Sequence, residues 1–200
     1  MMNKMVLYLI RHGKTLCNER RLYCGKSDVS LSELGYKEII ELKSTVDYPK
    51  CRLNYTSGAK RANETFEIIF PNSKYAKKND FFEYNFGDFE MKSYDMLKDN
   101  SDYIAWIMDE SKKVKCPNGE CKEEFYRRLS KALRRLFREV IEKGEEEALL
   151  ICHGGVIGTL LELFCKSSKD FYTMQPSCGR GYKLEVKVDK DIEIKILGEI

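Results

Sequence analysis

The only two histidines of the chain occupy the same setting, each at the end of an apolar run and directly before glycine. His12 follows residues 6–10 and Arg11, and His153 follows residues 148–152. An imidazole at the point where a buried strand gives way to a loop lies at the carboxyl edge of a sheet, where open α/β folds hold their ligands. One such histidine is more often structural than catalytic. Both histidines of the chain lie at such a place, and one of them has an arginine beside it, which favours a catalytic pocket.

Arginines add the second part of this chemistry. Arg11 lies beside His12, and Arg61 opens a predicted helix after another strand. Planar guanidinium groups match phosphate oxygens, and helix N-termini add backbone donors. The sequence therefore predicts a pocket for a phosphoryl group. A neutral His12 would take that group and water would remove it, while the arginines lower the His12 pKa and stabilise the transferred charge. We expect no metal and no cofactor.

The leaving alkoxide needs a proton from an acid whose pKa is raised. Glu83 lies within the aromatic segment 81–87, where apolar surroundings and a bound phosphate would both disfavour its charged form. Glu83 is therefore the candidate acid. Asp80, Asp88 and Glu90 are nearby, and the sequence separates them poorly from Glu83.

Size and charge narrow the class of protein. The chain has 200 residues, 42% of them hydrophobic, and a net charge of +3. This size suits one domain, residues 1–200, and the charge is too small to make nucleic acid the main partner. We expect a small phosphorylated metabolite as the partner and leave a homodimer open. The apolar run 5–10 is too short for a signal peptide or a membrane span.

The eight cysteines include no C-x-x-C pair. A chain of this length needs no disulfides, so we expect reduced thiols and a cytoplasmic protein. No cysteine or histidine spacing recommends a metal site.

Apolar patterns predict alternating strands and helices. The expected elements are a buried central strand at 4–10, a helix from a capping box at 30–33 to about residue 45, a strand at 51–56, a helix at 59–70, a weaker strand at 74–78, a long amphipathic helix around 125–140, a strand at 148–152, a helix at 156–164, and strands at 181–188 and 191–197 that form a hairpin. This order predicts an α/β three-layer sandwich, with a mainly parallel central sheet and helices on both faces.

Two stretches need separate interpretations. Residues 81–120 break the alternation, with aromatic clusters and short helical patterns at 94–98 and 102–109, so we interpret them as a small helical and loop cap over the sheet edge. The long amphipathic helix carries arginines on its polar face, for which we prefer a solvated surface to a binding surface. These arginines are Arg127, Arg128, Arg134, Arg135 and Arg138.

Residues 9–15 together with Asn18 resemble the signature of the histidine phosphatase superfamily, which includes the phosphoglycerate mutases. Further matches follow in order at Gly25, Asp28, and residues 31–35, 56–57, 60–65, 83–90, 117–120 and 152–155. The resemblance implies the sandwich fold with an insertion above the site. It also implies a role for each matching residue: His12 as phosphorylated nucleophile, Glu83 as proton donor, Arg11, Arg61 and His153 as the phosphate pocket, and Asn18, Cys24, Gly25 and Gly154 as substrate contacts.

Within the superfamily the chain looks like a phosphatase rather than a mutase, because it is short and has Glu-Tyr-Asn-Phe-Gly around the acid. Residues 22–25, 86–91, 103–106 and 117–120 are similar to the α-ribazole phosphatases of cobalamin biosynthesis, which hydrolyse α-ribazole 5′-phosphate. Cys121, Cys152 and Met91 depart from common family residues, which leaves substrate choice open. The alternatives are a broad-specificity or sugar phosphatase and, from another class, a non-catalytic module that binds a phosphate ligand.

Overall fold

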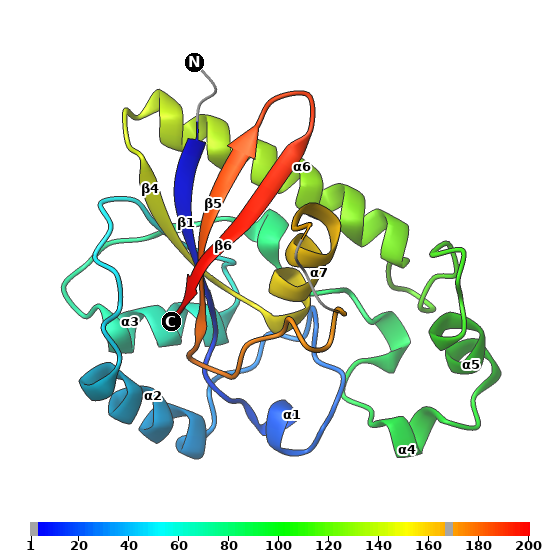
Figure 1. The fold of residues 1–200 in the computed structure, drawn as a ribbon. Helices are drawn as coiled ribbons and strands as arrows, with labels where there is room; N and C mark the ends of the chain where they lie inside the picture. Colours follow the sequence, from blue (N-terminus) through cyan, green and yellow to red (C-terminus); the bar gives the residue numbers. More distant parts are fainter. Residues whose placement is uncertain (1–3, 167–169) are drawn as a thin grey trace.

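The computed structural model describes residues 4–166 and 170–200, which fold around one six-stranded sheet (Figure 1). The strands lie in the order β3-β2-β4-β1-β5-β6. Their bounds are β1 Lys4–Arg11, β2 Asn54–Thr56, β3 Ala76–Lys77, β4 Glu147–Cys152, β5 Gly181–Val188 and β6 Ile192–Glu199. The first four in this order pair in parallel, and β5 and β6 form an antiparallel hairpin. The predicted α/β class, central first strand and closing hairpin are confirmed.

The pairing of β1 with β4 brings the two histidines together. Its register places Val6 opposite Glu147 and Arg11 opposite Cys152, so both strands end at the same level. Most apolar side chains of both strands are buried, as expected of strands covered by helices on both faces, and Val6 and Tyr8 are half-buried. The residue after each strand therefore stands at the same edge of the sheet.

Helices cover both faces of the sheet, and two separate cores show which helix covers which face. On one side, residues of α2 (Glu33–Thr45) and α3 (Lys60–Ile69) pack on Ile10, Leu149 and Ile151. On the other side, α6 (Lys122–Glu142) and α7 (Gly154–Phe164) pack on alternate residues of the same strands, such as Leu9 and Leu150. Figure 1 shows the two layers on either side of the strands.

The segment between β3 and α6 carries the short helices α4 (Tyr94–Leu97) and α5 (Ser101–Ile107). Its aromatic rings stack on one another with centroids 5.0–6.0 Å apart and join the core beneath α6 and α7. The participating rings are Tyr84, Phe86, Phe89, Tyr103 and Trp106. This packing places the segment beside the edge of the sheet where the histidines lie.

Three predicted boundaries were wrong. The strands expected at 51–56 and 74–78 contain only Asn54–Thr56 and Ala76–Lys77, because only these residues reach the neighbouring ladders. The capping box expected at residues 30–33 is absent from that stretch. Ser32 alone caps α2 by accepting a hydrogen bond from the Gly35 N–H at 3.0 Å. A capping box does occur in α1 (Leu16–Glu19), where Thr15 and Asn18 form it.

Two global properties follow from the described part of the chain. No helix in it is both long and apolar enough to cross a membrane. Within the same residues no two cysteines form a disulfide.

Candidate active site

His12 and His153 lie next to each other where β1 and β4 end. The His12 N–H donates to the Cys152 carbonyl at 3.0 Å, which extends the parallel ladder by one residue. The two imidazole centroids are 5.1 Å apart in an edge-to-face arrangement. His12 is 5% exposed and His153 is fully buried. The predicted convergence of the two histidines is thus what the fold produces.

The hydrogen bonding of His12 fixes which of its nitrogens is free. Nδ1 lies 2.7 Å from the carbonyl oxygen of Gly13, and because a carbonyl only accepts, Nδ1 must carry the hydrogen. Burial, followed by the positive charge of Arg61, holds the His12 pKa well below its ordinary value of 6.5, and Arg11 acts in the same direction. At neutral pH His12 therefore presents an uncharged ring with a lone pair on Nε2.

His153 is neutral for the same reasons. Burial lowers its pKa first, and the charges of Arg61 and Arg11 lower it further. Its Nε2 lies 2.8 Å from the Ser57 hydroxyl, a partner that the sequence analysis did not identify. Within the described residues, His153 Nδ1 and Arg11 Nε are buried without a hydrogen-bond partner. Buried polar groups are nearly always satisfied, so this pair of nitrogens fits a site for an oxygen-rich ligand.

Arg61 lies on the first turn of α3, as expected, and is only 1% exposed. Its guanidinium donates to the carbonyls of Gly25 at 2.8 Å and Ser27 at 2.9 Å, and it lies 5.7 Å from the centroid of the Phe82 ring. The same loop caps α3, because Asp28 accepts from the first helical N–H, that of Lys60, at 2.6 Å. The loop between α1 and α2 and the start of α3 therefore hold each other in place.

Contacts separate the four carboxylates that the sequence left in competition. Glu90 accepts the backbone N–H groups of Gly25, Lys26, Ser27 and Phe86 at 2.9–3.2 Å. Asp80 pairs with Arg135, and Asp88 accepts from Asn118. Of the four, only Glu83 lines the cavity that His12 lines.

The Glu83 carboxylate is held by two backbone N–H groups. Oε1 accepts from Tyr84 at 2.9 Å, and Oε2 accepts from Gly155 in the first turn of α7 at 2.8 Å. Burial raises the Glu83 pKa, and the two hydrogen bonds and the charges of Arg61 and Arg11 oppose this rise without cancelling it. The carboxyl group therefore keeps its proton to a higher pH than an ordinary glutamate.

Two cavities meet at Glu83. The smaller, about 190 Å³, is polar and is lined by Arg11, His12, Thr15, Asn18, Leu22, Tyr23, Cys24, Arg61, Glu83, Phe86, Gly154, Gly155 and Gln175. The larger, about 490 Å³, is walled by aromatic rings that include Tyr23, Phe86, Trp106, Tyr126 and Phe171. Glu83 and Gly155 line both, so a molecule could place one end in each cavity with Glu83 at the junction.

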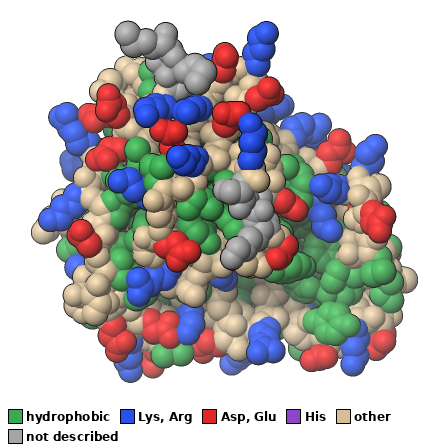
Figure 2. Space-filling model, viewed as in Figure 1, with side chains coloured by type: hydrophobic (Ala, Val, Ile, Leu, Met, Phe, Trp, Pro, Cys, Tyr) green, Lys and Arg blue, Asp and Glu red, His purple; other side chains and the backbone are tan. Residues whose placement is uncertain are grey.

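Figure 2 shows the surroundings of these cavities on one face of the molecule. Hydrophobic side chains gather on the side that carries α4 and α5, around a hollow. Elsewhere on this face, basic and acidic side chains are interspersed and form no large basic patch. This distribution agrees with a small-molecule site better than with a nucleic-acid surface.

The remaining predicted substrate contacts differ in placement. Asn18, Cys24 and Gly154 line the polar cavity. Gly25 does not, because its N–H binds Glu90 and its carbonyl binds Arg61. Burial raises the pKa of the Cys24 thiol to about 12, so Cys24 lines the cavity as a neutral thiol and does not act as a nucleophile.

Thr15 and Gln175 are among the lining residues of the polar cavity to which sequence reasoning gave no role. Thr15 could have been found, because a threonine three residues before an asparagine is a helix-cap pattern directly after the histidine. Gln175 carried no such signal. It is an isolated polar residue in a loop and reaches both cavities only through the fold.

Within residues 4–166 and 170–200 no three histidine, cysteine, aspartate or glutamate side chains are grouped so that they could hold a metal ion.

The fold and the site together define an α/β protein with a histidine- and arginine-lined pocket for an anion. A family model for the histidine phosphatase superfamily, branch 1, matches residues 7–187. The chain belongs to this superfamily, and the resemblance noted in its sequence is confirmed.

The names of individual relatives describe different activities. An adenosylcobalamin/α-ribazole phosphatase of Salmonella typhimurium is 28% identical over 166 residues, which cover 78% of each chain. A probable phosphoglycerate mutase of Yersinia pestis is 28% identical over 158 residues, 78% of this chain and 72% of its own. The crystal structure of a phosphoglycerate mutase from Bacillus anthracis matches with a TM-score of 0.78 over 98% of this chain and 92% of that one, at 22% identity, which shows the shared fold.

Proposed function

We propose that the chain is a metal-independent phosphomonoesterase that works through a phosphohistidine. The observation that carries this proposal is the state of His12: neutral, with its Nε2 lone pair free, in a pocket that also holds Arg11 and Arg61. The Nε2–P bond forms as the bond from phosphorus to the substrate oxygen breaks. A water molecule then attacks the phosphohistidine and releases inorganic phosphate.

The cations and the second histidine stabilise the transferred group. Arg11 and Arg61 spread the charge of the phosphoryl oxygens, and the partnerless nitrogens His153 Nδ1 and Arg11 Nε are suited to bind those oxygens as donors. Ser57 can donate its hydroxyl hydrogen to His153 Nε2, and in that tautomer Nδ1 carries a hydrogen. His153 thus acts as a neutral donor beside His12.

Glu83 supplies the proton to the leaving oxygen. Its raised pKa keeps it protonated at the start, and its place at the junction of the two cavities is where the bond between phosphate and alcohol would lie. After the alcohol has left, the Glu83 carboxylate takes a proton from the attacking water, which restores the acid for the next turnover.

As the substrate we propose α-ribazole 5′-phosphate, hydrolysed in the cytoplasm during cobalamin biosynthesis. Its leaving alcohol carries an aromatic base, for which the aromatic walls of the 490 Å³ cavity are suited. Sequence similarity to the α-ribazole phosphatases supports this choice. In this proposal residues 81–120 form a cap that lines the alcohol side of the site.

The test has two parts. Wild-type protein is mixed with ³²P-labelled α-ribazole 5′-phosphate, quenched in alkali, and analysed for base-stable, acid-labile label on His12. The His12→Asn variant is expected to lose both label and turnover. Full turnover by this variant would refute the mechanism, whereas tight binding of the phosphate ligand by wild type without hydrolysis would support the non-catalytic alternative.

A substrate panel separates the proposed phosphatase from its enzymatic alternatives. We expect the highest kcat/KM for α-ribazole 5′-phosphate among that compound, sugar phosphates, phosphoserine and 3-phosphoglycerate. Comparable values for several sugar phosphates would instead favour the broad-specificity reading.

A further inference from the structure

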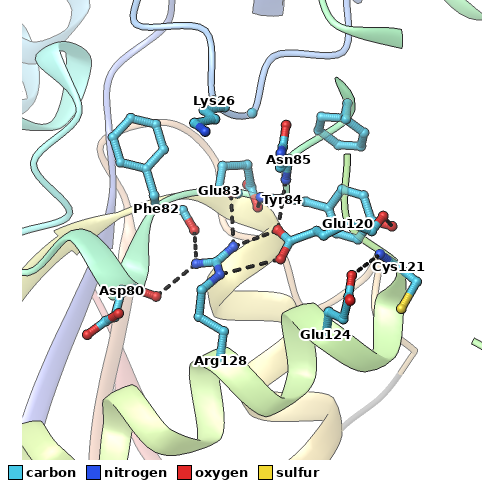
Figure 3. Close-up of polar contacts among 12 residues, drawn as sticks. Lys26, Asp80, Phe82, Glu83, Tyr84, Asn85, Glu120, Cys121, Glu124 and Arg128 are labelled. Carbon is cyan, nitrogen blue, oxygen red and sulfur yellow. Dashed lines mark hydrogen bonds and ion pairs between the residues drawn. The ribbon is translucent and has the colours of Figure 1, made fainter. Parts of the chain in front are cut away.

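Arg128 lies on the polar face of α6, where the sequence predicted solvated arginines, but its guanidinium faces the segment that carries Glu83 (Figure 3). Nη1 donates to the carbonyls of Asp80 and Phe82, both at 2.8 Å. Nη2 donates to the carbonyl of Glu83 itself at 3.2 Å. For Arg128 the solvated interpretation was wrong, because this side chain binds three backbone carbonyls of residues 80–83.

Glu120 completes this arrangement from the other side. Its Oε1 accepts from Arg128 Nη2 at 2.7 Å and from the backbone N–H of Asn85 at 2.8 Å. The Glu120 N–H donates to the Asn85 carbonyl at 3.0 Å. Contacts therefore hold the backbone at 80, 82 and 83 and again at 85, on both sides of the Glu83 side chain (Figure 3).

The Arg128–Glu120 pair is partly buried and packs on an aromatic ring. The side chains of Arg128 and Glu120 are 25% and 14% exposed, so their attraction is only partly screened by water. The guanidinium lies 4.9 Å from the centroid of the Phe125 ring, one turn earlier on α6. Only a planar fork with several donors can bind three carbonyls and a carboxylate together, which a lysine cannot do.

We propose that Arg128, paired with Glu120, is a positioning residue for the Glu83 proton donor. The inference rests on the proposed function of Glu83. The carboxyl end of Glu83 has its own contacts at Tyr84 and Gly155, but the backbone from which it projects is fixed by Arg128 and Glu120. Loss of the pair would let the carboxyl group move away from the leaving oxygen without removing a hydrogen bond of His12, Arg11 or Arg61.

Leaving-group dependence separates positioning of the acid from a general structural role. An alkoxide must receive a proton as it leaves, whereas p-nitrophenolate leaves without one. The kcat/KM value reports steps up to cleavage of the phosphorus–oxygen bond, so it excludes the later hydrolysis of the phosphohistidine. A displaced acid therefore lowers kcat/KM for alkyl phosphates and spares p-nitrophenyl phosphate.

The experiment compares Arg128→Met with Arg127→Met, the exposed neighbouring arginine of the same helix. The alkyl substrate is α-ribazole 5′-phosphate, or ribose 5-phosphate if the former is not hydrolysed. For Arg128→Met we expect kcat/KM to fall about 100-fold on the alkyl phosphate and less than about threefold on p-nitrophenyl phosphate. Arg127→Met is expected to match wild type on both.

Two milder variants keep the test decisive if Arg128→Met does not fold. Arg128→Lys and Glu120→Gln should show the same selective loss at smaller size, and their effects should not add, because the two residues act as one unit. Equal losses on both substrates, or no loss on either, would overturn the inference. Failure of the proposed function has a different signature, since wild type would then form no phosphohistidine with either substrate.

Discussion

Glu83 and Gly155 meet across the site, with the Gly155 N–H donating to Glu83 Oε2 at 2.8 Å. The approach depends on the missing side chain of Gly155, because a Cβ there would lie 2.4 Å from Glu83 Oε1. The contact joins the first turn of α7, directly after His153, to the segment between β3 and α6. The proton donor is thus placed by a backbone group of the same helix that follows the second histidine.

Replacing Gly155 with alanine should therefore displace the carboxyl group of Glu83. Because the clash involves the end of a flexible side chain, we expect the free energy of unfolding to change by no more than about 1 kcal/mol, while kcat/KM for an alkyl phosphate falls more than about tenfold. Kinetics and urea unfolding measure the two effects. Gly198→Ala in β6, where a Cβ meets nothing within 4 Å, is the matched control. An alanine variant with wild-type activity on alkyl phosphates would show that the Glu83 position does not matter.

The raised pKa of Glu83 predicts that kcat/KM falls at high pH for some substrates and not for others. Above pH 7 a phosphate monoester, whose second pKa is about 6, is fully ionised, and His12 is already neutral. Deprotonation of Glu83 should then lower kcat/KM for an alkyl phosphate up to tenfold per pH unit. The kcat/KM value for p-nitrophenyl phosphate should stay constant over the same pH range. In Glu83→Gln the alkyl profile should be low and without this fall at high pH. If kcat/KM fell at high pH for both substrates, the fall would belong to a group other than Glu83.

Both histidines should make the fold less stable in mild acid. Their pKa values are lowered in the folded chain, so below about pH 6.5 the unfolded chain binds protons that the folded chain does not. The free energy of unfolding should fall with decreasing pH by at most about 1.4 kcal/mol per pH unit for each histidine. Glu83 has a raised pKa and works in the opposite direction.

Urea unfolding of wild type and His12→Asn at pH 5, 6 and 7 tests this linkage. The wild-type free energy of unfolding should decrease more steeply toward pH 5 than that of the variant, whatever their difference at pH 7. Parallel pH dependences would mean that His12 titrates alike in the folded and unfolded chains.

The aromatic cavity should select the leaving alcohol. Tyr126 lines the aromatic cavity and does not line the polar cavity that holds His12. Tyr126→Ser should raise KM for α-ribazole 5′-phosphate about two- to tenfold, the value of one aromatic contact, with little effect on glycerol phosphate. Tyr36→Ser, at an exposed tyrosine of α2, serves as control. Equal effects on both substrates would remove Tyr126 from the alcohol site.

The sheet and the histidine pair could be predicted because their determinants are local. A strand buried on both faces is a continuous apolar run, and the parallel register of two such runs brings together whatever follows them. The lengths of β2 and β3 could not be predicted, since pairing with a neighbour, rather than the residue pattern, decides where a strand ends.

The role of a carboxylate depended on distant partners. Glu83 and Glu90 lie in one segment, yet Glu90 binds the loop at 25–27 and Glu83 binds Gly155. Helical periodicity correctly assigned Arg128 to the polar face of α6, but it could not show that this side chain contacts residues 80–83 instead of water. Such contacts arise only from tertiary packing.

The pairing of β1 in the sheet has a consequence for biosynthesis. Its two neighbours, β4 and β5, begin at Glu147 and Gly181, so the first strand leaves the ribosome long before either partner. Until residue 147 has been made, the apolar strand β1 has neither of its partner strands, and non-local parallel pairing is slow to form. The nascent protein gains its two adjacent imidazoles, and with them any catalytic power, only after residue 153 has been made.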